Sequence, residues 1–375
     1  MIYFDNSATS LIKPGEVKVA MSDALSGKYA NPSRGAYGPA LAAMNKIYQV
    51  RKSIAKLFGV EAMDIAFTPN ITSSLNLVIK SLFNEKDHVI TSVLEHNSVL
   101  RPLYQLQDRG MEISFLDCDD KFNLKYQDLE GLLRKNTRAL IITQASNVVG
   151  NISDLEKIYA FTKKHKLLLI IDGAQGAGAI KTDLSKFENA IYCFTGHKSL
   201  YGPTGTGGII NRSSEKFKPV FSGGSGYRSF ERHTPDIYPD LFEYGTINVH
   251  SIIGLGAGVD YLLKNPPYEK LEELSSYLYN SLKDIEGIKI YGDFEKNHLP
   301  ILSFNLLDYD SAFVSQILWE KLELCSRPNS HCAPLLHKRA GTEERGMVRL
   351  SLSTFNTKEE IDILKKFLEE MIVSK

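Results

Sequence analysis

The chain has 375 residues, of which 43% are hydrophobic, and its 44 Lys and Arg residues balance 44 Asp and Glu residues to a formal net charge of zero. This length and composition are typical of a globular protein with a buried core, built as two domains or as one large and one small domain, rather than of a disordered chain. A neutral chain without basic or acidic runs also argues against nucleic acid and anionic membrane surfaces as its main partners.

The N-terminal residues, MIYFDNSATS, contain neither the basic region nor the apolar stretch of a signal peptide. The apolar run at 167–171 ends at Asp172 and is far too short to span a bilayer. We therefore expect a cytoplasmic protein with no membrane partner.

Short apolar runs alternate with helical patterns along much of the chain. The strand-like runs lie at 87–92, 138–144, 167–172, 190–195 and 206–211, and helical patterns lie at 98–110 and 154–166. This alternation predicts an α/β fold with a mostly parallel sheet that is covered on both faces.

The pattern changes after about residue 250. Residues 250–263 and 268–287 are helical in pattern, 301–307 and 347–355 are strand-like, and 357–373 form an amphipathic helix with Thr357 and Glu360 as a capping pair. We interpret this part as a smaller α/β domain with which the N-terminal residues pack. The predicted division places 16–254 in the large domain, and 1–15 with 255–375 in the small one.

Several polar residues directly follow the predicted strands. Asp172 ends one apolar run, Asn147 and Lys198 come just after two others, and the sequence EHNS at 95–98 follows a fourth. Ligands of α/β sheets gather at the carboxyl ends of the strands, so this pattern favours one shared cleft.

The glycine-rich stretch FTGHKSLYGPTGTGG at 194–208 does not fit a Walker phosphate loop, because its lysine precedes the glycines. Thr72 and Ser73 offer another anion site, because they open the helical pattern within 67–82. An ordinary Ser/Thr helix cap explains these two residues equally well.

The four cysteines form no C-x-x-C pair, so neither a zinc site nor any other metal site is predicted. Cys193 lies in an apolar run and fits a buried thiol. Cys332 instead lies among polar and turn-forming residues beside His331, where it is either an inert loop cysteine or a reactive one.

The motifs SNVVG, DGAQ, FTGHKSLYGPTG, EYGT, NVHSIIGLGA, HCAP and VRLSLSTFNT follow one another along the chain. This ordered set resembles the class V aminotransferase-fold enzymes, which use pyridoxal 5'-phosphate (PLP), and within them the cysteine desulfurase and selenocysteine lyase family. The resemblance runs from YFDNSAT to STFNTKEEID, and the short HCA segment is most similar to the SUF-type group. It implies fold type I, with a large PLP-binding domain and a small domain carrying the cysteine loop.

The resemblance also implies a set of cofactor contacts. Lys198 becomes the residue that bonds covalently to PLP, Asp172 the partner of the ring nitrogen, Gln175 that of the ring hydroxyl, and His96 the side chain stacked on the ring. The remaining implied contacts are Asn147 near the ring and Thr72, Ser73, Thr195 and His197 at the phosphate. Thr246 is implied to reach the phosphate from a second subunit, which makes the protein a homodimer.

For the reaction, the resemblance implies that Arg349 binds the substrate carboxylate, with Arg327, Arg34 and Asn147 in the substrate site. Lys198 moves the Cα proton of L-cysteine or L-selenocysteine. Cys332 attacks the sulfur, leaving alanine and a persulfide that passes to an acceptor protein.

The segment NSHCA departs from the family's usual GHHCA, and residues 225–245 also differ from the SUF-type enzymes. These departures lie near the substrate and acceptor sites, so a selenocysteine-selective lyase remains an alternative. A class V aminotransferase and a catalytically inactive PLP-fold binding module are more distant alternatives.

Overall fold

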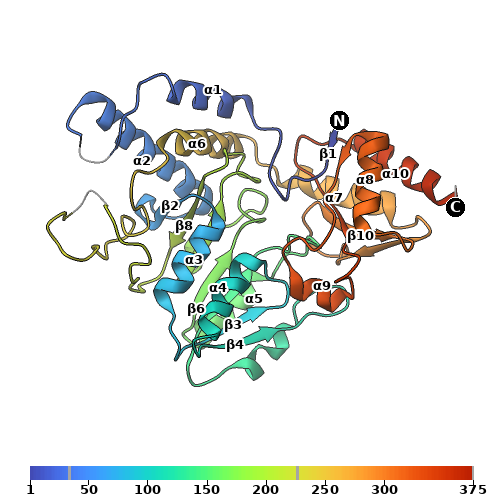
Figure 1. Ribbon diagram of the computed structural model, residues 1–375, viewed down its shortest axis with the longest axis horizontal. Coiled ribbons are helices and arrows are strands. Elements are labelled where there is room, and N and C mark those ends of the chain that lie inside the picture. Colours follow the sequence, from blue (N-terminus) through green and yellow to red (C-terminus); the bar gives the residue numbers. More distant parts are fainter. Residues whose placement is uncertain (33–34, 225–227, 374–375) are drawn as a thin grey trace.

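The computed structural model describes residues 1–32, 35–224 and 228–373, which form two lobes (Figure 1). The strands are β1 (Ile2–Tyr3), β2 (Ile65–Thr68), β3 (His88–Ser92), β4 (Glu112–Leu116), β5 (Thr137–Thr143), β6 (Leu168–Asp172), β7 (Ala190–Thr195), β8 (Gly207–Asn211), β9 (Ile288–Tyr291), β10 (Ile301–Leu306), β11 (Leu324–Cys325) and β12 (Val348–Ser351). The α-helices are α1 (Gly15–Ala24), α2 (Gly38–Phe58), α3 (Ile71–Leu82), α4 (Asn97–Gln107), α5 (Leu155–Lys164), α6 (Val249–Lys264), α7 (Tyr268–Leu282), α8 (Ser311–Leu322), α9 (Pro334–Ala340) and α10 (Lys358–Val373).

The large lobe is built on a seven-stranded sheet in the order β2-β8-β7-β6-β5-β3-β4. Strand β8 runs antiparallel to both of its neighbours, and the pairs from β7 to β4 are parallel. The predicted α/β fold with a mainly parallel sheet is therefore confirmed.

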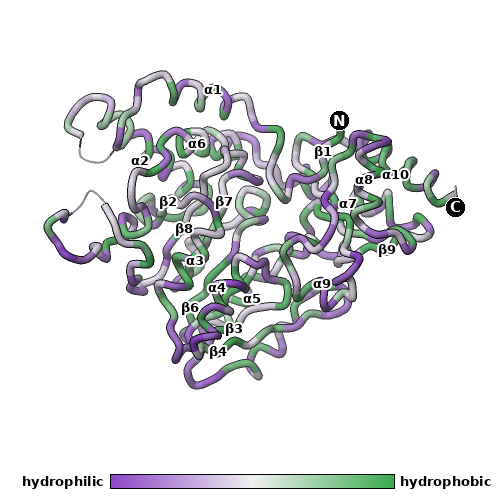
Figure 2. Tube along the Cα trace, viewed as in Figure 1, coloured by the Kyte–Doolittle hydropathy of each residue, from purple (hydrophilic) through white to green (hydrophobic). Residues whose placement is uncertain are grey.

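Both faces of this sheet are covered by helices. Neighbouring residues of each strand point to opposite faces, so they belong to different buried clusters. Ile141 and Ile170 belong to a buried cluster with residues of α3 and α4. Ile142 and Ile171 belong to a second cluster with residues of α2, α5 and α6. Figure 2 shows hydrophobic stretches along the strands of both lobes.

The small lobe has an antiparallel sheet in the order β12-β10-β9, with α7, α8 and α10 contributing to its core. The N-terminal residues join this lobe, since β1 pairs with β11 and Phe4 is buried in the same core. Helix α6 runs through the predicted boundary at 254/255 and packs against α1 and α2. The exact domain division stays a prediction.

The two largest differences from the predicted boundaries are at helix α7 and strand β12. Helix α7 ends at Leu282 instead of 287, and Gly287 takes a left-handed φ of 82° in the turn into β9. Strand β12 ends at Ser351 instead of 355, because Asn356 Oδ1 accepts a hydrogen bond from the Ser353 N–H at 2.8 Å and closes a turn. In both places a turn interrupts an apolar pattern that the sequence alone shows as continuous.

Candidate active site

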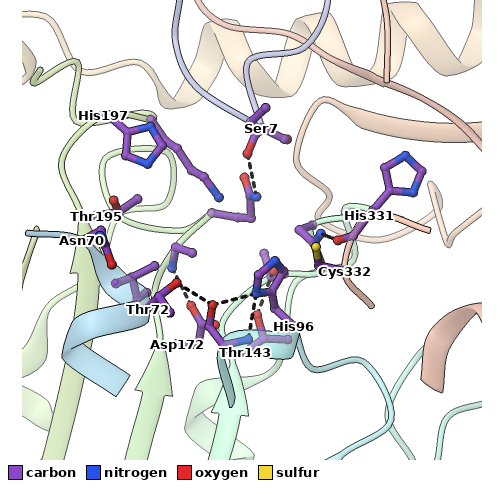
Figure 3. Close-up of a pocket in the computed structure, with 18 of the residues that line it drawn as sticks. Ser7, Asn70, Thr72, His96, Thr143, Asp172, Thr195, His197, His331 and Cys332 are labelled. Carbon is purple, nitrogen blue, oxygen red and sulfur yellow. Dashed lines mark hydrogen bonds between the residues drawn. The ribbon is translucent and has the colours of Figure 1, made fainter. Parts of the chain in front are cut away.

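A cavity of about 360 Å³ lies at the carboxyl ends of β5, β6 and β7, where it also meets the segment after β11 (Figure 3). The predicted residues that line it are Thr72, His96, Asn147, Asp172, Gln175, Thr195, His197, Lys198, Arg327, Cys332 and Arg349. The structure thus brings together eleven residues that are scattered over the sequence, at the edge of the sheet where the cleft was predicted.

Lys198 and Asp172 supply the opposite charges in the interior of this cavity. Burial lowers the pKa of the Lys198 amine to about 8, and Arg349 acts in the same direction, while the carboxylates of Asp172 and Asp5 oppose the change. Asp172 is 2% exposed, and its Oδ1 accepts a hydrogen bond from the Ala174 N–H at 2.9 Å. Burial raises the pKa of Asp172, whereas that N–H and Lys198 lower it. An amine with a pKa of about 8 is partly neutral near physiological pH, as a nucleophile or base must be.

His96 is held as a neutral ring at the start of α4. Its Nδ1 accepts a hydrogen bond from the Ser98 N–H at 3.0 Å, so the ring proton of the neutral form is on Nε2. The pKa of His96 is lowered to about 4, first by burial and then by nearby cations that include Lys198 and Arg349. The imidazole therefore faces the cavity as a flat uncharged ring (Figure 3).

A second group of polar residues lies where α3 begins. Asn70 caps the helix, with its Oδ1 accepting from the Ser73 N–H at 2.9 Å, and Thr72 Oγ1 lies 2.8 Å from Ser98 Oγ. Thr72 lines the cavity, but Ser73 is not among its lining residues. His197 also lines it, and its pKa is lowered to about 4, first by burial and then by Lys198 and Lys13.

The arginines enter from the small lobe. Arg349 is 2% exposed; its Nη1 donates to the Asn147 carbonyl at 2.9 Å and its Nη2 to Asp5 Oδ1 at 2.7 Å. Its Nε is buried without a hydrogen-bond partner among the described residues, so the guanidinium retains a free donor. Arg327 pairs with Arg349 through the backbone, and its Nη1 lies 3.7 Å from Asp5 Oδ2.

Cys332 lies on the loop between β11 and α9, and its side chain is directed toward the cavity (Figure 3). The residue is exposed, unlike the buried Cys118 and Cys193. Its carbonyl accepts a hydrogen bond from the Asn97 N–H at 2.8 Å, and Asn147 Nδ2 donates to the His331 carbonyl at 2.8 Å. The thiol is therefore accessible on a backbone that the large lobe holds.

One predicted residue lies elsewhere, and another falls outside the described residues. Thr246 lines a separate cavity of about 230 Å³ with Phe67, Pro69 and Tyr244, and it is not among the residues that line the Lys198 cavity. Arg34 lies outside the described residues. Within the described ranges, no group of three or more His, Cys, Asp or Glu side chains is arranged to hold a metal ion, and no helix is long and apolar enough to cross a membrane.

The family model for class V aminotransferases matches residues 2–364 of the chain. The chain belongs to the class V aminotransferase family. A probable cysteine desulfurase of Methanothermobacter thermautotrophicus is 30% identical over 99% of this chain and 94% of its own length. A probable cysteine desulfurase of Pyrococcus abyssi is 32% identical over 100% of this chain and 95% of its own length. The apo structure of a cysteine desulfurase from Thermococcus onnurineus NA1 superimposes with a TM-score of 0.91 at 30% identity, covering 100% of this chain and 95% of that one.

Sequence reasoning missed several residues of this cavity. Ser7, Asn70, Ser98 and Thr143 also line the cavity, and Asp5 contacts both arginines. Asn70 precedes the helical pattern and could have been found as its cap. Asp5 gave no such signal, because its partners Arg327 and Arg349 are more than three hundred residues away along the chain.

Proposed function

We propose that the protein is a PLP-dependent cysteine desulfurase, which converts L-cysteine to L-alanine and leaves the sulfur on Cys332. The observation that supports this proposal most directly is that one cavity is lined by Lys198, Asp172, Arg349 and Cys332. These supply an amine for the cofactor, a buried carboxylate, a guanidinium for a substrate carboxylate, and a thiol to take the sulfur. The names of relatives that match over nearly the whole chain support the same activity.

The lining of the cavity fits PLP, which has an aldehyde, a basic ring nitrogen and a phosphate. Lys198 supplies an amine with a lowered pKa for the aldehyde, and Asp172 a buried carboxylate for the ring nitrogen. His197 Nδ1 is buried without a partner in the described part of the chain, which suits a missing phosphate contact. The residues that would hold the group are Thr72, Thr195 and His197 at the phosphate, His96, Asn147 and Gln175 at the ring, and Thr246 of a second subunit. Ser73, which was also predicted at the phosphate, does not line the cavity.

Bound PLP supplies an electron sink that stabilises negative charge at the Cα atom of an amino acid. Lys198 moves the Cα proton, since its amine is partly neutral near a pKa of about 8. Arg349, whose Nε has no partner among the described residues, grips the substrate carboxylate together with Arg327. His96, being neutral, would lie against the ring without adding a positive charge beside the ring nitrogen.

Cys332 takes the sulfur as a nucleophile. Its thiolate attacks the sulfur of bound cysteine; a bond forms between the two sulfurs while the carbon–sulfur bond breaks. The electron pair of that bond stays with the carbon, which then takes up a proton and leaves as alanine. The terminal sulfur next passes to the thiolate of an acceptor, either a small thiol or a protein cysteine, and the Cys332 thiolate is regenerated.

One assay separates this function from its alternatives. Wild type and Cys332→Ala are given cysteine or selenocysteine in turn, and alanine, sulfide or selenide, and persulfide on the trapped protein are measured. We expect alanine from cysteine with wild type only, and residual selenide release by Cys332→Ala because selenium leaves carbon more readily. A wild type that acts on selenocysteine alone indicates the lyase suggested by the altered NSHCA segment. Full cysteine turnover by Cys332→Ala, or amino transfer to a keto acid, contradicts the proposal.

The homodimer is part of the proposal. Tyr37, Leu41, Met44 and Tyr48 recur at helical spacing on and just before α2, and they are 56%, 43%, 49% and 42% exposed. An exposed apolar stripe of this kind marks an interaction surface. A second copy that contacts this stripe also accounts for Thr246, which lines a different cavity from Lys198.

We further propose a cytoplasmic location, because the four free cysteines suit a reducing compartment.

A further inference from the structure

The loop that carries Cys332 has an unusual backbone. His331 has a φ of 50° and Cys332 a φ of 57°, so two consecutive residues with side chains lie in the left-handed region. Residues other than glycine persist there only where the surrounding structure holds them. Hydrogen bonds to the two carbonyls, from Asn147 Nδ2 and from the Asn97 N–H, supply part of that support.

The rest of the support comes from three buried, hydrogen-bonded side chains, those of His331, His337 and Thr342. His331 Nε2 lies 3.0 Å from the Arg327 carbonyl oxygen, and His331 Nδ1 lies 3.3 Å from His337 Nε2. His337 Nδ1 in turn lies 2.9 Å from Thr342 Oγ1. His331, His337 and Thr342 are only 6%, 1% and 2% exposed. His331 is among the residues that line the cavity, but Figure 3 shows its ring directed away from it, whereas Cys332 is directed toward it.

The chemistry of the bonded groups fixes the donor and the acceptor in each of these three hydrogen bonds. A carbonyl oxygen only accepts, so His331 carries its proton on Nε2. Its Nδ1 must then accept from the Nε2–H of His337, whose Nδ1 accepts from the Thr342 hydroxyl. Burial, Arg349, His337 and Arg327 together hold the pKa of His331 well below its usual range, although its hydrogen bond to the Arg327 backbone opposes this. Burial lowers the pKa of His337 against an opposing contribution from the Thr342 backbone. Both rings are neutral, and His331 has no free lone pair.

We propose that His337 and Thr342 are positioning residues, which act through His331 to hold the Arg327 carbonyl and the Cys332 loop, and that His331 exchanges no proton with the Cys332 thiol. The consequence extends to both arginines. The backbone N–H groups of Arg327 and Arg349 each donate a hydrogen bond to the carbonyl of the other residue, at 3.1 and 2.8 Å. The hydrogen bonds that hold the Arg327 carbonyl therefore also hold the substrate-carboxylate site.

The first test measures the Cys332 thiol itself and does not depend on turnover. Purified holoenzyme is treated with iodoacetamide from pH 6 to 10, and the peptide containing Cys332 is quantified by mass spectrometry, with the Cys118 and Cys193 peptides as buried references. We expect the pH of half-maximal alkylation to be the same in wild type, His331→Gln and Thr342→Val. A shift of one pH unit or more in His331→Gln would mean that the ring exchanges a proton with the thiol, and the proposal would be overturned.

The second test rests on the proposed function and uses a matched pair. Thr342→Val removes the hydroxyl at nearly constant volume, and Thr342→Ser retains it. We expect Thr342→Val to raise the KM for cysteine about fivefold, which corresponds to the loss of about one hydrogen bond, with kcat within about twofold of wild type. Thr342→Ser should restore the KM. An unchanged KM in Thr342→Val, or equal defects in both variants, would overturn the positioning role. Failure of wild type to use cysteine would instead contradict the proposed function, and the alkylation test would still decide the role of His331.

Discussion

Asp5 and Arg349 form an ion pair across the length of the chain, with Asp5 Oδ1 2.7 Å from Arg349 Nη2. The Arg349 side chain is 3% exposed and that of Asp5 17%. The other carboxylate oxygen of Asp5 lies 3.7 Å from Arg327 Nη1. One carboxylate thus faces two guanidinium groups, which leaves them a net positive charge to offer a substrate and fixes the orientation of the buried one.

Removal of this carboxylate tests its orienting role. We expect Asp5→Ala to raise the KM for cysteine about tenfold, because a hydrogen bond to a charged group contributes about 1.5–3 kcal/mol and Arg349 loses its lateral support. Asp5→Asn retains an acceptor oxygen and should have a clearly smaller effect. Steady-state kinetics at fixed pH provide the measurement. Equal KM values in wild type and Asp5→Ala would show that Arg349 is oriented by the Asn147 carbonyl alone.

A second prediction concerns the lysine that carries the cofactor. Borohydride reduction of the PLP-loaded protein, followed by peptide mass spectrometry, should locate the cofactor on Lys198. Lys198→Arg should lose the adduct and about 10²–10⁴-fold in turnover, the usual contribution of a positioned acid or base. Lys13 is a matched control, because burial lowers its pKa to about 8 as well. An adduct that persists in Lys198→Arg and disappears in Lys13→Arg would refute the assignment.

A third prediction concerns Glu95, a fully buried carboxyl beside the site. Its pKa is raised to about 8, chiefly by burial and also by Asp172, against the opposing hydrogen bonds from Ser92 and the Thr143 N–H. One carboxyl oxygen has no partner within the described residues, and burying such an oxygen costs less free energy when the acid is neutral than when it is ionised. In the unfolded chain the pKa is near 4.5. The folded state therefore binds the extra proton between these values, and this contribution to stability is lost as the pH rises through about 8.

Glu95→Gln keeps the shape of the side chain and removes its titration. Between pH 5.5 and 8.5 we expect the Tm of wild type to fall by ~5 °C more than that of Glu95→Gln, since the linked free energy is on the order of a few kcal/mol. Differential scanning fluorimetry of the two proteins in one buffer series measures this. Parallel Tm curves would mean that Glu95 is ionised in the folded protein.

Much of the large lobe could be predicted from the sequence, because the strands of a buried parallel sheet are continuous apolar runs. The expected strand at 190–195 coincides with β7, and 167–172 differs from β6 by one residue. The polar residues at the ends of these strands were predictable for the same reason, since parallel strands end at one edge. This is how Asp172 and Lys198 could be placed in a common cleft.

The parts that could not be predicted depend on contacts between distant segments. Asp5 meets Arg349 only because β1 and β12 belong to the same lobe, and no local pattern indicates this. The His331–His337–Thr342 chain likewise depends on how the loop before α9 folds back on the turn after it. The local apolar pattern likewise predicted that strand β12 continues past Ser351. The strand ends there because the side chain of Asn356 closes a turn with the Ser353 N–H.

The last prediction concerns the dimer. If the exposed stripe on α2 contacts a second copy, Leu41→Glu with Met44→Glu should bury two unpaired charges there and shift the protein to a monomer in sedimentation velocity experiments. Phe313→Glu is the matched control, because Phe313 is 45% exposed against 43% for Leu41 but lies on α8 in the small lobe. The monomer should also retain PLP less tightly, since it lacks the Thr246 hydroxyl of a partner, whereas the control should remain dimeric and loaded. A Leu41→Glu/Met44→Glu protein that is still dimeric would place the interface elsewhere, and a wild-type monomer with full activity would rule out a shared site.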